Sequence, residues 1–154
     1  MVIKHDSDIK LLQQLFNELD SKEKSNHLFF EGQIYDAYSL MMNILRKAKK
    51  EIIIIDNYAG KELFDLIKVV KIKIKIYSKN IDQESLKKYQ KQYQNIEIVN
   101  NDKFHDRFII IDQKILYHCG ASFKDLGDKC FGINLIEDRE YLKNILNYLQ
   151  GHIK

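Results

Sequence analysis

Hydrophobic residues recur along this chain with two spacings, one typical of helices and one typical of strands. Helical spacing predicts helices over residues 7–20, 33–49, 61–69, 83–93 and 141–149. Alternating or continuous apolar runs predict strands over residues 27–30, 51–56, 71–77, 96–99, 107–112, 115–120 and 130–136. The four consecutive isoleucines at residues 52–55 indicate a strand covered on both faces, as strands of a parallel sheet are.

Strands that alternate with helices predict an α/β fold, with a mostly parallel, mixed central sheet and helices on both faces. We divide the chain into an N-terminal amphipathic helix and linker, residues 1–26, and a domain over residues 27–154. The early helix has three open roles: it packs on the domain, builds a dimer or connects to another domain. In such sheets ligands bind beyond the carboxyl ends of strands, which is where Asn57 follows the isoleucine run.

Composition narrows the class of protein. With 154 residues the chain can bury a core without metal or disulfide staples, and Cys119 and Cys130 form no C-x-x-C pair. We expect no membrane partner because no apolar run approaches the ~20 residues that a spanning helix needs. The first residues lack the apolar stretch of a signal peptide, so we predict a cytoplasmic protein. A net charge of +3 permits an anionic partner without requiring one.

The predicted strand near residue 107 carries the most specific pattern of polar side chains. His105 and Arg107 lie two residues apart, so on a strand they project from one face, about 7 Å apart. Both can therefore reach one phosphate. Asp112 has the opposite parity, so we expect it to hydrogen-bond backbone or pair with a charge while it braces the site. A turn of small residues follows at Gly120-Ala121-Ser122.

The spacing His105-x-Arg107-x4-Asp112, followed by this turn, resembles the phospholipase D superfamily, whose signature is H-x-K-x4-D and a Gly-Ser-x-Asn turn. The runs FFEGQIYDAYS, HDRFIIID and GASFKDLG look similar to single-motif, nuclease-like members from bacteria and phages. The resemblance covers about residues 27–150. It implies a phospholipase D-like fold and a metal-independent phosphodiesterase, most often a nuclease acting on nucleic acid, in the cytoplasm and with a link to phage or defence.

The resemblance also implies a mechanism in which a histidine attacks phosphorus and forms a phosphohistidine, while a second histidine protonates the leaving oxygen. Single-motif members supply the second histidine by forming a homodimer. The catalytic residues would be His105, Arg107 and Asp112, with no cofactor and no metal. We assign substrate binding, from the turn and from element ends, to Gly120, Ser122, Lys124, Asn57 and Glu31.

An alternative from another class is a non-catalytic module that binds phosphate or nucleic acid through a degenerate site. It is favoured by Arg107, where the signature has lysine, and by the absence of the signature asparagine from the turn. A third possibility is an interaction domain that acts through the helix at residues 7–20. Lys71, Lys73 and Lys75 line one strand face, and we interpret them as solvating lysines that prevent edge pairing and not as a nucleic-acid contact.

Overall fold

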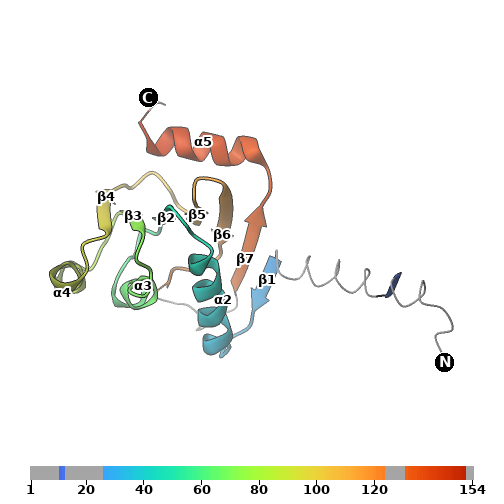
Figure 1. The fold of residues 1–154 in the computed structure, drawn as a ribbon, viewed down its shortest axis with the longest axis horizontal. Coiled ribbons are helices and arrows are strands. Elements are labelled where there is room, and N and C mark those ends of the chain that lie inside the picture. The colour runs from blue at the N-terminus through green and yellow to red at the C-terminus, as the bar shows by residue number, and fades with distance from the viewer. Residues whose placement is uncertain (1–10, 13–25, 124–130, 152–154) are drawn as a thin grey trace.

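A computed structural model describes residues 11–12, 26–123 and 131–151. Seven strands form one sheet, and Figure 1 shows α2 and α5 on opposite sides of it. The strands are β1 (Asn26–Phe29), β2 (Glu51–Ile55), β3 (Lys73–Ser78), β4 (Ile96–Asn100), β5 (Arg107–Ile111), β6 (Ile115–Cys119) and β7 (Phe131–Ile136). The helices are α2 (Ile34–Arg46), α3 (Lys61–Ile67), α4 (Gln83–Gln92) and α5 (Arg139–Leu149). The predicted α/β class is confirmed; most of the predicted helix at residues 7–20 lies outside the described residues.

The sheet has the strand order β1-β7-β6-β5-β2-β3-β4 and is mixed, as predicted. Only the pairs β2–β3 and β3–β4 are parallel, whereas β1–β7, β7–β6, β6–β5 and β5–β2 are antiparallel. The parallel part is therefore smaller than the sequence predicted. For one of these pairs the physical reason is the tight turn that joins β5 to β6, which forces the two strands to run in opposite directions.

Both faces of the sheet are buried, and alternate isoleucines of β2 serve each face. Ile52 and Ile54 belong to the core under α2, α3 and α4, and Ile53 and Ile55 belong to the core under α5. Burial of each such side chain contributes about 1.5–3 kcal/mol, so the isoleucine run fixes β2 at the centre of the fold. The prediction of a strand covered on both faces is confirmed.

The lysines of β3 correct one interpretation. β3 lies between β2 and β4, so it is not an edge strand and its lysines do not prevent edge pairing. Lys73 is exposed, whereas Lys75 is half-buried with its Nζ 5.7 Å from the centre of the Tyr77 ring. The face carrying these lysines is solvated at the start of β3 and buried at its end, where Tyr77 joins the core under α5.

Candidate active site

Strand register brings several predicted site residues to one edge of the sheet. The parallel strands β2 and β3 end there at Ile55 and Ser78, and the antiparallel β5 begins there at Arg107. Cys119, at the end of β6, pairs with Arg107. We call this end of the sheet, where the parallel strands finish, the carboxyl edge; it is not one of the outer strands, β1 and β4. Ligands bind at this end in sheets of this class. The opposite, amino edge carries the turn between β5 and β6.

His105 lies at the carboxyl edge, two residues before β5 begins, so it is in the loop and not on the strand. Its side chain is exposed and makes no hydrogen bond or ion pair with another described residue. The preceding residue, Phe104, is half-buried, with ring centroids 6.1 Å from Phe108 and 5.4 Å from Tyr148. The backbone around His105 is therefore packed, while its imidazole remains open to a ligand.

Asn57 holds this loop from β2. Its Nδ2 donates a hydrogen bond of 2.6 Å to the carbonyl oxygen of Phe104, directly before His105. Among the described residues, Asn57 Oδ1 and Ser78 Oγ are buried polar atoms without a hydrogen-bond partner. Unpaired buried groups of this kind are uncommon in folded proteins, and a functional role is one explanation for them.

Asp106 lies close to a histidine of the neighbouring strand β6. Its Oδ1 lies 3.6 Å from Nε2 of His118, a half-buried residue of β6 whose ring packs 5.4 Å from that of Phe108. The sequence did not single out His118. Its partner, Asp106, directly follows His105, so this contact is part of the candidate site.

Arg107 is a second anchor of the loop. Its Nη2 donates to the carbonyl oxygen of Gly120 at 2.7 Å, and its Nε donates to that of Cys119 at 3.4 Å. The guanidinium thus ties β5 to the turn that follows β6. These bonds leave Nη1 without a partner among the described residues, so one nitrogen of the fork remains for a phosphate.

A buried carboxylate, which the sequence did not single out, connects the ends of β2 and β6. Asp56 is fully buried and accepts hydrogen bonds from Ser122 Oγ at 2.9 and 3.0 Å, from the Phe123 backbone at 2.9 Å and from the Tyr58 backbone at 3.0 Å. The only signal in the sequence was a carboxylate that ends an isoleucine run. The hydroxyl of Ser122 is directed inwards at Asp56 in this structure, and not towards the exposed side of the turn.

Asp112 is not brought together with His105. It lies at the amino edge, where its carboxylate accepts hydrogen bonds from the backbone N–H groups of Lys49, Lys50 and Glu51 at 2.7–3.1 Å. The backbone donors of Glu51, Lys50 and Lys49 lower the pKa of Asp112 below 3.8. Of the two roles expected from its parity, hydrogen bonding to backbone is the observed one, and it joins α2 to β2 away from the site.

The remaining predicted residues are placed as follows. Gly120 is exposed at the carboxyl edge, and its N–H donates to Gly132 at 2.7 Å. Glu31 is exposed just beyond β1, at the same edge but three strands away from β5. Lys124 lies outside the described residues.

The thiol of Cys119 lies beside this site but is not available to it. Burial, together with the charge of Asp56, raises the pKa of Cys119 to about 12, so the thiol stays protonated and unreactive at neutral pH. The parts of the chain that the structure describes contain no group of three or more histidine, cysteine and carboxylate side chains placed to hold a metal ion. In the same parts, no helix is long and apolar enough to cross a membrane.

No family model matches this chain, and no curated protein matches its sequence. Solved structures do match. NucT from Helicobacter pylori superposes with a TM-score of 0.61 at 20% identity, covering 82% of this chain and 93% of that one. Nuc from Salmonella typhimurium, a phospholipase D family member, gives 0.56 at 15% identity, with 82% and 92% covered.

A third match is TrmBL2, an archaeal chromatin protein described as having a novel mode of DNA binding. Its TM-score is 0.51 at 15% identity, over 96% of this chain and 64% of that one. All of these identities are low, so the likeness concerns the fold. It shows that this chain shares the fold of NucT and of the phospholipase D family member Nuc.

Proposed function

We propose that the protein is a metal-independent phosphodiesterase that acts on nucleic acid. The observation that carries the proposal is the state of His105: its imidazole is exposed and pairs with none of the described residues, while its loop is fixed by the hydrogen bond from Asn57 and by those of Arg107 to Cys119 and Gly120. A nucleophile needs this combination of an open side chain and a fixed backbone. The fold shared with NucT and Nuc supports the same class of reaction.

In the proposed reaction the imidazole of His105 attacks phosphorus, forming an N–P bond as the P–O bond to the leaving group breaks. The His105 of a second copy donates a proton to the leaving oxygen. Water then gives a proton to the second histidine and attacks the phosphohistidine, so that the N–P bond breaks and the first histidine is released. The free nitrogen of Arg107 and the ammonium group of Lys124 are proposed to stabilise the charge on the phosphoryl oxygens. The N–H of Gly120 is bonded to Gly132, so we assign Gly120 a structural role in the turn.

The proposed roles of two residues follow their observed contacts. The hydroxyl group of Ser122 donates its one proton to Asp56. We therefore propose that Ser122 positions the turn and does not donate a hydrogen bond to substrate. Asp112 supports the connection between α2 and β2 and takes no part in proton transfer.

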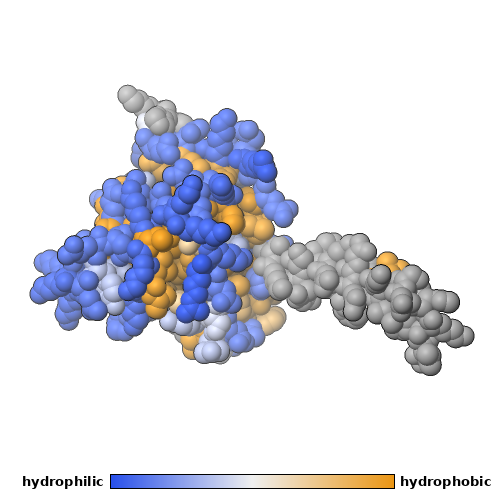
Figure 2. Space-filling view, viewed as in Figure 1, coloured by the Kyte–Doolittle hydropathy of each residue, from blue (hydrophilic) through white to orange (hydrophobic). Residues whose placement is uncertain are grey.

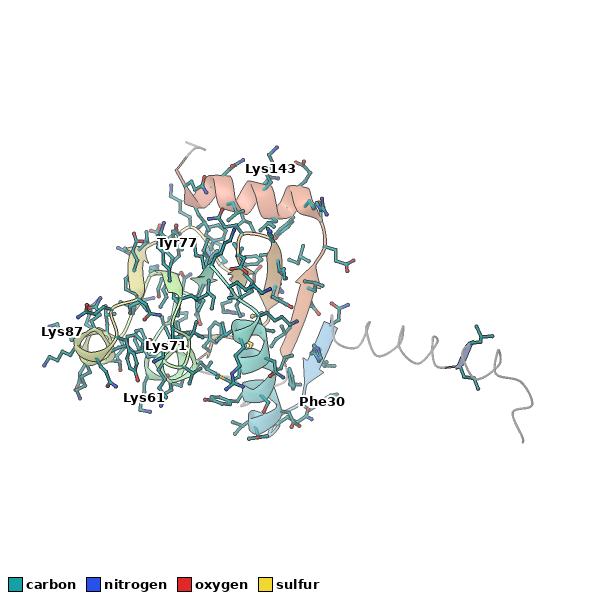
Figure 3. The ribbon with its side chains drawn as sticks, in the orientation of Figure 1. Phe30, Lys61, Lys71, Tyr77, Lys87 and Lys143 are labelled. Carbon is teal, nitrogen blue, oxygen red and sulfur yellow. The ribbon has the colours of Figure 1, made fainter. Side chains whose placement is uncertain are left out.

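A homodimer would supply the second histidine, and exposed apolar side chains at the carboxyl edge support it. Phe30, labelled in Figure 3, is 61% exposed and Tyr35 is 79% exposed. The same surface, around the end of β1 and the start of α2, includes Leu28, Ile34 and Tyr38. A second copy that covers these side chains would remove them from water. Light scattering of Phe30→Asp beside the unchanged protein tests this surface, and a dimer that persists in the variant rules it out.

Hydrolysis in excess EDTA tests the proposed activity. Single- and double-stranded DNA, RNA and bis(p-nitrophenyl) phosphate are each offered to the protein, to His105→Ala and to the control His5→Ala. We expect turnover by the protein and by His5→Ala, and a loss of at least 100-fold in His105→Ala. Equal turnover by all three would contradict the role of His105.

A second candidate is a nucleic-acid-binding module without turnover. It is favoured by the bonds of Arg107 to the carbonyls of Cys119 and Gly120, which occupy most of the guanidinium fork, and by the fold shared with the chromatin protein TrmBL2. If no substrate is hydrolysed, while the protein and His105→Ala bind DNA equally well, this candidate replaces the first.

A further inference from the structure

The face of α5 that borders the amino edge forms a groove with an unusual set of side chains. The groove has a volume of about 550 Å³, within the range of ligand sites. It lies between α5 and the turn that joins β5 to β6. The lining residues are Gln113, Lys114, Arg139, Leu142, Lys143, Leu146, Asn147 and Gln150. They comprise three cations, three amides and two leucines, and no carboxylate.

No carboxylate lines this groove, in contrast to the two grooves beside α3. Lys114, Arg139 and Lys143 form no ion pair with a described carboxylate. The groove between α3 and α4 carries ion pairs, Lys61–Asp65 at 2.6 Å and Lys88–Glu84 at 3.3 Å. The groove at the ends of β2 and β3 has equal numbers of cations and carboxylates, Lys61 and Lys79 against Glu62 and Asp82. An anionic ligand therefore gains most at the α5 groove.

Carboxylates do occur in the adjoining hollow, which shares Lys114 and Arg139 and also contains Glu137 and Asp138. The carboxylate of Asp138 accepts hydrogen bonds from the backbone of Glu140 at 2.9 Å and of Tyr141 at 3.4 Å and so caps α5, but Asp138 and Glu137 keep their negative charges and disfavour an anion at this end. The anion-binding surface accordingly extends from Lys114 along α5 in the direction away from Asp138.

The shape of the groove favours an extended ligand. Four of its residues, Arg139, Lys143, Asn147 and Gln150, follow one flank of α5 over 11 positions, or about 16 Å of helix. A single phosphate would meet only one or two of them. Leu142 and Leu146 form an apolar floor beneath the polar rim, against which sugars or bases can pack. Figure 2 shows hydrophilic side chains over the outer surface of α5.

We propose that this groove binds the phosphodiester backbone of a nucleic-acid strand at a second site, separate from His105. The cations contact phosphates, and the amides hydrogen-bond to phosphate, sugar or base edges. The two sites are separated by the length of β5, roughly 16 Å by the rise per residue of a strand. The groove thus holds nucleic acid while His105 stays open, whether or not His105 is catalytic.

The test measures binding in a His105→Ala background, so that hydrolysis plays no part. A fluorescent single-stranded DNA oligonucleotide is titrated with this protein and with a variant that also carries Lys114→Gln, Arg139→Gln and Lys143→Gln. The control carries Lys71→Gln, Lys87→Gln and Lys91→Gln, which remove the same charge from exposed positions away from α5. Figure 3 labels Lys143 on α5, and Lys71 and Lys87 apart from it.

We expect the affinity of the groove variant for the oligonucleotide to fall at least ten-fold. The slope of log K against log salt concentration should also become smaller by about 2, because each of the three lost phosphate contacts contributes ~0.7 on a single strand. The control should lose less than three-fold. Equal losses in the two variants would overturn the proposal and leave a general charge effect. Binding of poly-glutamate as tight as that of DNA would overturn it as well, in favour of an acidic polypeptide.

Discussion

Asn57 and Phe104, which are 47 positions apart in the sequence, are joined by a hydrogen bond of 2.6 Å that fixes the backbone directly before His105. The amide orientation follows from chemistry, because a carbonyl oxygen can be met only by the Nδ2 end of the side chain. Asn57→Asp keeps the size of the side chain and removes this donor. If the proposed activity holds, we expect kcat to fall about 10- to 100-fold, with a smaller change in KM, because the imidazole loses its fixed position.

A matched variant separates positioning from a general effect of the added charge. Asn43→Asp makes the same change at an exposed position of α2 and should leave kcat within two-fold. A variant of Asn57 that raised KM while leaving kcat intact would instead assign this residue to substrate binding, as the sequence first indicated. Single-turnover kinetics on one oligonucleotide distinguish the two results.

The buried pair Asp56–Ser122 is expected to be a main support of the turn after β6. Ser122→Ala removes a donor from a carboxylate with no exposed surface, and a bond of this kind contributes about 1.5–3 kcal/mol. We expect urea unfolding to show a loss of that size. Ser85→Ala removes an exposed serine–aspartate bond of 2.8 Å to Asp82 and should cost less than about 1 kcal/mol, because water replaces it. Equal losses would contradict the importance of burial.

The sequence predicted the elements of the fold closely, because each buries a face with its own local period. The ends of β2 and β5 fall within a residue of the predicted ones, and the isoleucine run lies at the centre of the sheet as its pattern required. The contacts that build the candidate site were beyond this reasoning. Asp56 and Ser122 lie 66 positions apart, and Asp106 and His118 meet across two strands. Such pairs depend on strand order and register, which no local period encodes.

The type of contact that Asp112 makes was predicted correctly, but its position in the fold was not. Its parity excluded proton transfer and favoured backbone contacts, which is what the structure has. The length of β5 then carries it to the amino edge, away from His105. A one-dimensional spacing cannot distinguish a residue that braces the site from one that braces the far end of the same strand.

The position of Asp112 predicts a specific dependence of stability on pH. Its pKa is lowered on folding by the N–H groups of Glu51, Lys50 and Lys49, so the stabilisation is present above pH 3.8 and is lost as the pH falls through the folded pKa. Asp112→Asn should unfold at lower urea concentration at pH 7, and its difference from the unchanged protein should shrink below pH 3.8. Asp102→Asn, at an exposed position, should show no such convergence. A difference that stays constant with pH would contradict the assignment.

Gln113 adopts a left-handed backbone conformation, which is energetically unfavourable for glutamine. Asp112 and Gln113 have φ values of 54° and 56°, and Lys114 N–H donates to Ile111 at 2.9 Å, which together define a type I′ turn. Aspartate tolerates this left-handed region, whereas glutamine incurs about 1 kcal/mol there that glycine does not. Gln113→Gly should therefore stabilise the protein by about 0.5–1 kcal/mol in urea unfolding, despite the loss of its exposed 3.3 Å contact with Glu51. Gln90→Gly, the same change in α4, should destabilise the protein by about 1 kcal/mol. A loss of stability in both variants would contradict the prediction that glycine relieves strain in the turn.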